Sequence, residues 1–113
     1  MLPKNNRLTK KKDFELVFNL GKSVKDGFLL YKVVKGSAQQ SRFGFIVSKK
    51  ISNKAVVRNK VRRRMQKAVG DAFRESAQPV DVVLIALSGI QEKEFSQVQE
   101  KVVKFLNKIN QYV

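Results

Sequence analysis

Two stretches in the first half of the chain carry the residue pattern of β-strands. Phe43, Phe45 and Val47 recur at every second position of one stretch, and the other, from Phe28 to Val34, is rich in aromatic and β-branched residues. A period of two is typical of a strand with one buried face. The predicted strands cover residues 28–34 and 42–48, with a polar loop over 36–41 between them and a short edge strand near 22–25.

Helical spacing of apolar residues marks the two ends of the chain. Phe14, Val17 and Phe18 fall on one side of a predicted helix over residues 11–19, which Gly21 ends in a C-cap role. A helix predicted over residues 92–110 ends the chain, and its apolar positions are Phe95, Val98, Val102, Leu106 and Ile109.

The middle of the chain predicts one more helix and one more strand. A basic segment over residues 58–74 has helical spacing, and Gln78-Pro79 interrupts that pattern. The apolar run over residues 80–87 then predicts a buried strand. With 113 residues the chain is predicted to be one α+β domain, ordered α-β-β-β-α-β-α, with helices packed on a four-stranded sheet. Residues 1–10 are basic and polar, and we expect them to form a flexible arm.

Composition narrows the functional classes. The hydrophobic content of 42% supports a packed core, and no apolar run approaches the ~18 residues that cross a bilayer. No signal-peptide pattern opens the chain, and the absence of Cys fits a cytoplasmic protein. The chain also has no His, so Ser/His/Asp and Cys/His catalysis are excluded. Its own side chains are therefore not expected to break a bond.

The nine acidic residues do not have the spacing of a carboxylate metal site. A metal-dependent nuclease that uses Asp13, Asp71 or Asp81, brought together by the fold, stays open as an alternative. We expect no metal bound by the protein alone.

The distribution of charge is the strongest functional signal. The formal net charge is +15, and half of the 24 Lys and Arg lie between Gly27 and Gly70, where there is no Asp or Glu. A helix face exposed only to solvent normally mixes both signs, because opposite charges four residues apart stabilise it. Like charges here stand at positions such as Arg58 and Arg62. This surplus indicates a polyanionic partner, and nucleic acid fits it best.

A helical wheel divides the basic segment into two faces. Val57, Val61, Met65, Ala68 and Ala72 form a stripe that is expected to face the core, which disfavours insertion of the same helix into a membrane. Arg is suited to phosphate contacts, and Asn can donate and accept. The candidate nucleic-acid contacts are Arg58, Asn59, Lys60, Arg62, Arg63, Arg64 and Lys67.

Two smaller groups accompany this helix. Ser48, Lys49 and Lys50 lie at the end of a predicted strand and place a hydroxyl and two ammonium groups there, either as a generic basic loop or as part of the site. Phe14, Phe18 and Tyr31 either pack in the core or stack on unpaired bases. Spacing alone leaves both alternatives open.

Taken in order, these segments resemble the protein component of bacterial ribonuclease P over nearly the whole chain. The basic helix matches the family's Arg-Asn-rich signature at Arg58, Asn59, Arg62 and Arg63, whereas Lys60 and Gln66 stand where the family often has Arg. The other matching motifs are Arg7-Leu8, Asp13-Phe14 with Val17-Phe18, Gly21-Lys-Ser-Val24 and Val47-Ser-Lys-Lys50.

The resemblance implies a fold and a function. The fold would contain a left-handed crossover, through the basic helix, between two parallel strands. The function would be that of an accessory subunit of an endoribonuclease, in which a catalytic RNA uses Mg²⁺ to remove the 5′ leader of precursor tRNA. The basic helix would bind ribonuclease P RNA. Phe14, Phe18, Tyr31, Ser48, Lys49 and Lys50 would line the cleft for the single-stranded leader, and no further protein partner is implied. The alternative from the charge alone is a structural RNA-binding protein of ribosomal type.

Overall fold

Four strands form one mixed sheet in the computed structural model, which describes residues 2–75 and 78–113. The order across the sheet is β1-β2-β4-β3; β2 pairs antiparallel with β1 and β4, and β3 pairs parallel with β4. The predicted strands are confirmed, with ends that differ by at most two residues. The strands are β1 (Lys22–Asp26), β2 (Leu29–Lys35), β3 (Arg42–Ile46) and β4 (Val80–Ala86).

Three α-helices are present, as predicted, but their ends differ. The helices are α1 (Lys11–Leu20), α2 (Ala55–Ala72) and α3 (Phe95–Asn107). Phe73 leaves the helical conformation at the end of α2, and its ring packs edge-on against Phe43 at 4.9 Å between centroids. Glu94 forms a capping box with Gln97, so α3 begins later than predicted. Short 3₁₀ turns flank these elements: η1 (Lys4–Asn6), η2 (Ile90–Glu92) and η3 (Ile109–Tyr112).

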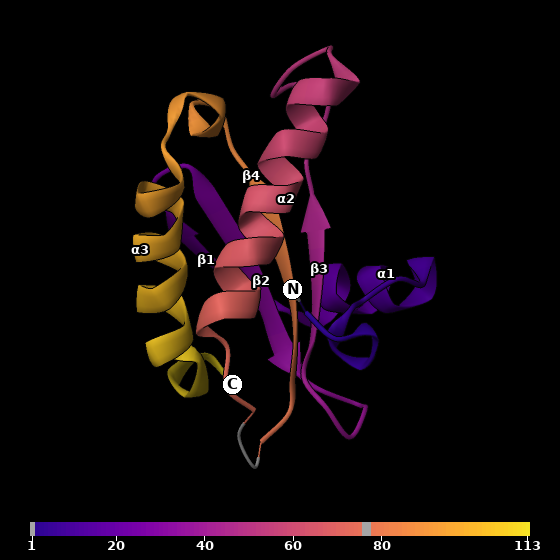
Figure 1. Cartoon of the computed structure of the whole chain (residues 1–113). Coiled ribbons are helices and arrows are strands. Elements are labelled where there is room, and N and C mark those ends of the chain that lie inside the picture. The colour runs from indigo at the N-terminus through magenta and orange to yellow at the C-terminus, as the bar shows by residue number, and fades with distance from the viewer. Residues whose placement is uncertain (1, 76–77) are drawn as a thin grey trace.

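The helices cover the two faces of the sheet unequally. Figure 1 shows α2 and α3 in front of the sheet and α1 on the other side. The main core lies beneath α2 and α3 and includes Tyr31, Met65 and Phe105. A second, smaller core joins α1 to the opposite face through Leu8, Val17 and Val83. We call these two surfaces of the sheet the α2/α3 face and the α1 face.

α1 lies across the strands on the α1 face. Lys32, Val83 and Gly44 stand side by side on β2, β4 and β3. Phe18 meets Lys32, whose Nζ is 5.9 Å from the ring centroid, and a Cβ added at Gly44 would collide with the Phe14 ring. Gly44 therefore lets Phe14 lie directly against β3.

The connection from β3 through α2 to β4 is left-handed. In Figure 1, with α2 in front of the sheet and β3 pointing upwards, the chain returns in β4 on the left of β3. Crossovers between parallel strands are right-handed in about 98% of cases, so this one is exceptional. The left-handed crossover that the resemblance implied is confirmed.

The N-terminal segment is packed, which corrects the expectation of a flexible arm over residues 1–10; Met1 lies outside the described residues. Leu2 and Leu8 are buried, and the Leu8 N–H donates to Phe43 O at 2.8 Å, so the segment covers part of the β3 edge. The Asn6 amide donates to Ser41 O at 2.7 Å, and Glu75 accepts hydrogen bonds from Asn6 and Ser41. The polar and basic residues of this segment suggested mobility, because their partners Ser41 and Glu75 are far away in the sequence and cannot be recognised from it.

Candidate nucleic-acid interface

The predicted inner stripe of α2 faces the core. Val61, Met65 and Ala68 are buried, and Val69 joins them. Val57 and Ala72, at the two ends of the stripe, are half-buried. This packing fixes the rotation of α2 about its axis and leaves its basic positions on the outer surface.

The outer face of α2 carries the predicted basic residues, and most of them have only local partners. Arg58 donates to Ser52 O at 2.9 Å, Arg62 to Asn59 Oδ1 at 2.7 Å, and Arg64 to Lys93 O at 2.9 Å. All three acceptors are uncharged, so these contacts orient the guanidinium groups without neutralising them. Each group keeps further N–H donors for an external ligand.

Lys60 and Arg63 are exposed and form no hydrogen bond or ion pair within the part of the chain that the structure describes. Lys67 is the exception on this face: its Nζ lies 2.7 Å from Asp71 Oδ2 and 5.3 Å from the centroid of the Phe95 ring. The hydrogen bond from Lys67 lowers the pKa of the Asp71 carboxyl below its ordinary value.

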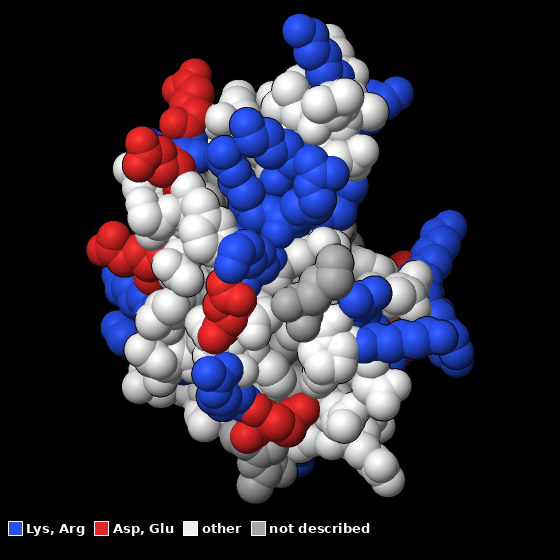
Figure 2. All heavy atoms as spheres, viewed as in Figure 1, with Lys and Arg blue, Asp and Glu red and all other residues white. Residues whose placement is uncertain are grey.

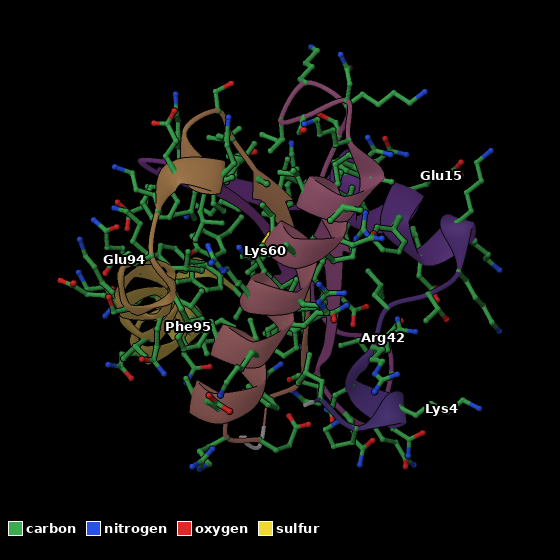
Figure 3. All side chains as sticks on the ribbon, turned by 45° about the horizontal axis from the view of Figure 1, so that its top comes forward. Lys4, Glu15, Arg42, Lys60, Glu94 and Phe95 are labelled. Atoms are coloured by element: carbon green, nitrogen blue, oxygen red, sulfur yellow. The ribbon has the colours of Figure 1, made fainter. Side chains whose placement is uncertain are left out.

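Charge is segregated on this side of the molecule. Figure 2 shows Lys and Arg gathered over α2, while the acidic side chains visible in this view lie mainly on the α3 side and towards the bottom. The two labelled residues Lys60, on α2, and Glu94, on the α3 side, mark this division in Figure 3. Grouped cations with few acids attract polyanions and raise their association rate.

The α1 face contains a row of partly exposed apolar side chains beside the small core under α1. Leu30, Ile85 and Ile46 stand side by side on β2, β4 and β3, one row beyond the residues beneath α1. All three are half-buried. We call this row the open strip. Phe18, 38% exposed, lies on α1 over the neighbouring row, and Phe14 is half-buried on the same helix.

The predicted basic loop follows the open strip at the end of β3. Ser48, Lys49 and Lys50 are exposed, and the Lys50 N–H donates to Ser48 Oγ at 3.3 Å. The loop then leads into α2. It therefore connects the α1 face to the basic surface of α2, and an extended anion could contact both.

Tyr31 does not belong to this group, and its predicted place in the cleft is wrong. It lies on the α2/α3 face, fully buried, with its ring stacked on Phe105 at 3.8 Å between centroids. Burial, together with the nearby Asp26, raises the pKa of the Tyr31 hydroxyl well above its usual range. Neighbouring residues of a strand face opposite sides, so Tyr31 and Lys32 cannot share one face.

Arg42 carries a cluster of paired charges on the α1 face. Its Nε and Nη2 donate to the two oxygens of Asp81 at 3.0 and 2.8 Å, and its Nη1 donates to Asp13 Oδ2 at 3.1 Å. Figure 3 shows Arg42 between β3 and the N-terminal part of the chain. The hydrogen bonds and the negative charge of Asp81, with help from Asp13, raise the pKa of Arg42 above its ordinary value despite partial burial.

The same cluster bears on metal chemistry. Asp13 and Asp81 bind Arg42, and Asp71 binds Lys67, so a cation already contacts each carboxylate of the nuclease alternative. No group of three potential metal ligands occurs among residues 2–75 and 78–113. The described donor set does not fit a Mg²⁺ site.

Two charged residues of the α1 face were not identified from the sequence as candidate site residues. Lys32 stands beside Phe18, and Arg42 anchors α1 through Asp13. Lys32 is the one charged residue inside the run 28–34, and that irregularity was the available signal. No sequence signal reveals the partners of Arg42, because Asp81 is 39 residues away.

Fold and surface together define a small basic α+β protein with a continuous cationic surface of the type that binds polyanions. A family model described as Ribonuclease P matches residues 2–110. The chain belongs to this family: it is a protein component of bacterial ribonuclease P, a subunit of the endoribonuclease of tRNA 5′ processing, with ribonuclease P RNA as its partner.

Individual relatives agree with this assignment. The ribonuclease P protein component of Bacillus velezensis is 35% identical over 112 residues, covering 98% of this chain and 95% of the relative. That of Syntrophomonas wolfei is 31% identical over 108 residues, covering 96% and 90%. The RNase P protein structure from Thermotoga maritima has a TM-score of 0.76 at 28% identity, covering 90% of this chain and 96% of that one.

The fold is also that of the RNase P protein from Staphylococcus aureus, with a TM-score of 0.77 at 23% identity over 95% of this chain and 96% of that one. No helix within the described ranges combines the length and the apolarity that a membrane span requires.

Proposed function

We propose that the outer face of α2 binds ribonuclease P RNA and that the α1 face, with the β3–α2 loop, binds the 5′ leader of precursor tRNA. The observation that carries the proposal is the surplus of cations on α2 that lack a carboxylate partner. The contacts to the RNA subunit are assigned to Arg58, Asn59, Lys60, Arg62, Arg63, Arg64 and Lys67.

The exposed guanidinium groups supply the affinity for the RNA subunit. Arg63 and Lys60 have no internal partner among the described residues, so they lose no interaction when they meet a phosphate. Arg62, held by Asn59, presents its remaining donors in a fixed orientation. Each phosphate that such a cation neutralises releases condensed counterions, which favours binding at low salt.

The leader is assigned to the surface between α1 and the open strip. Phe18 exposes an aromatic ring on which a base can stack. Phe14, on the same helix, packs its ring against β3 at Gly44. Ser48, Lys49 and Lys50 stand at the end of the strip and can contact the leader phosphates. Lys32, beside Phe18, adds a further cation.

The side chains on these two surfaces indicate which part of the reaction the protein supports and which part belongs to the RNA. The protein supplies positive charge and stacking surfaces. Mg²⁺ would be held by the RNA, and there it would supply activation of water and stabilisation of the departing oxygen. The contribution of the protein to the rate is then tighter binding of precursor tRNA and screening of phosphate repulsion, with no proton transferred by a protein side chain.

Reconstitution with a bacterial ribonuclease P RNA tests this proposal. Precursor tRNA cleavage is measured across a Mg²⁺ series, with and without the protein, and the affinity of the holoenzyme is compared for precursor and mature tRNA. We expect the protein to lower the Mg²⁺ requirement and to favour the precursor. An unchanged Mg²⁺ requirement together with equal affinity for the two tRNAs would refute the leader assignment. Cleavage by the protein without RNA would instead support a metal-dependent nuclease.

A further inference from the structure

A pocket of about 190 Å³ opens at the β3 edge, between the N-terminal segment, α1 and α2. This volume is somewhat larger than the ~150 Å³ cavity that binds benzene and well below the ~300 Å³ at which sites for drug-sized ligands begin. It suits one flat ring system. The walls are apolar and include Phe14, Phe43 and Phe45, while Arg7, Thr9 and Gln66 supply polar groups.

Gln66 gives the pocket its chemical character. Its side chain is half-buried on α2 and has no hydrogen-bond partner among the described residues. A carboxamide offers two N–H donors and one carbonyl acceptor, and the edges of nucleobases carry the complementary pattern of donors and acceptors. A half-buried amide without a partner, beside aromatic walls, is therefore suited to read the edge of a base.

The surroundings connect the pocket to the basic surface. Gln66 follows Arg62 and Arg63 by four and three residues, so its side chain lies next to theirs on the helix. On the other side of the pocket, the Arg7 Nε donates to Leu2 O at 3.0 Å, which holds its planar guanidinium close to the opening. A strand whose phosphates contact α2 can therefore turn one base into the pocket.

We propose that this pocket takes one unpaired nucleobase of the RNA that α2 binds, with the base against the Phe walls and its edge hydrogen-bonded to the Gln66 amide. The inference rests on the function proposed for α2. It gives Gln66, which stands where the family often has Arg, a role in base recognition in place of a phosphate contact.

Binding of Gln66→Ala to ribonuclease P RNA over a salt series tests the inference. The loss of amide hydrogen bonds is expected to weaken binding about 3–10-fold, with an unchanged slope of log K against log salt, because no charge is removed. Gln99→Ala is the matched control: Gln99 is half-buried on α3, has no partner among the described residues, and lies off the pocket lining. An effect of equal size in Gln99→Ala, or a changed slope in Gln66→Ala, would overturn the inference.

Arg63→Ala, measured in parallel, separates this inference from the proposed function. Wild-type binding by Gln66→Ala together with weakened binding by Arg63→Ala overturns the pocket and leaves the function of α2 intact. Wild-type binding by both variants overturns both.

The source of the base is found with two further measurements on the reconstituted holoenzyme. We expect weaker binding of the RNA subunit, with the affinities of the assembled holoenzyme for precursor and mature tRNA reduced equally or not at all. A loss confined to precursor tRNA would place the base in the leader and would overturn its assignment to the RNA that α2 binds. Nuclear magnetic resonance titration of the free protein with AMP, CMP, GMP and UMP provides the direct observation. We expect shifts of the Gln66 side-chain amide and the Phe45 ring signals. No shift with any of the four nucleotides would contradict the proposal.

Discussion

The Arg42 cluster and the outer face of α2 hold the same kind of side chain in opposite electrostatic conditions. Arg42 is half-buried and meets two carboxylates, one of them Asp81, which is only 5% exposed. Arg63 is exposed and meets no carboxylate within the described residues. A buried charge must be paired because desolvation is costly, whereas an exposed one keeps its water until a ligand replaces it. The comparison separates arginines that hold the fold from arginines available to RNA.

The largest effect is expected from breaking the paired cluster. Arg42→Met leaves Asp81 buried without a partner and removes the link from Asp13 to β3, which should destabilise the fold by about 3–5 kcal/mol. Chemical denaturation measures this change. Lys67→Met, which removes an exposed ion pair, is the control and should leave the denaturation midpoint nearly unchanged. Equal destabilisation of the two variants would contradict the view that the ion pairs of Arg42 stabilise the fold more than the exposed ion pair of Lys67.

The next effect concerns the leader surface. Phe18→Ala should weaken precursor tRNA binding to the holoenzyme by about 1–3 kcal/mol, because a stacking surface is lost, and should leave mature tRNA binding unchanged. Leu20→Ala, on the same helix and 68% exposed, is the matched control. Equal losses for precursor and mature tRNA in Phe18→Ala would place the ring outside the leader site.

A smaller effect is expected from a single available cation. Arg63→Ala should bind ribonuclease P RNA more weakly and reduce the salt slope of log K by about 0.7–0.9 for one lost phosphate contact. Its thermal stability should match that of the wild type, since Arg63 has no internal partner among the described residues. Binding isotherms at several salt concentrations supply the slope, and an unchanged slope would contradict a phosphate contact.

The smallest effect is an increase in affinity. Among residues 2–75 and 78–113, Asp71 is the one carboxylate paired with a cation on the outer face of α2, and Asp71→Asn would free Lys67 for RNA. We expect modestly tighter binding at low salt that disappears at high salt, because the change is electrostatic. The same isotherms measure it. Weaker binding of this variant would indicate that Asp71 positions Lys67 for its contact.

Local patterns in the sequence were sufficient to predict many features of this protein. The period of Val61, Met65 and Ala68 sets the buried side of α2 and thereby the exposed position of Arg63. The alternation of apolar and polar residues predicted the strand positions. The excess of cations and the matched motifs predicted an RNA partner. These features depend on neighbours within a few residues, which a sequence displays directly.

Other features required the arrangement of elements in space. Tyr31 had two possible environments, and the pairing of β2 with β4 beneath α3 placed it in the core, away from α1. The N-terminal segment is held in place by hydrogen bonds among Asn6, Ser41 and Glu75, which come from three distant parts of the chain.

Periodicity and charge are local properties of the chain, so the positions of the helices and strands, the inward stripe of α2 and the uncompensated charge on its outer face could be predicted from the sequence. The contacts of Arg42 with Asp81 and Asp13, and the pocket that Gln66 lines with Phe14 and Phe45, could be found only from the three-dimensional fold. Such neighbours are set by strand register and by which face of the sheet each helix covers, and both depend on contacts between residues far apart in the sequence. The cations of α2 are a property of the sequence, whereas the pocket beside Gln66 exists only because the fold brings α2, β3 and the N-terminal segment together.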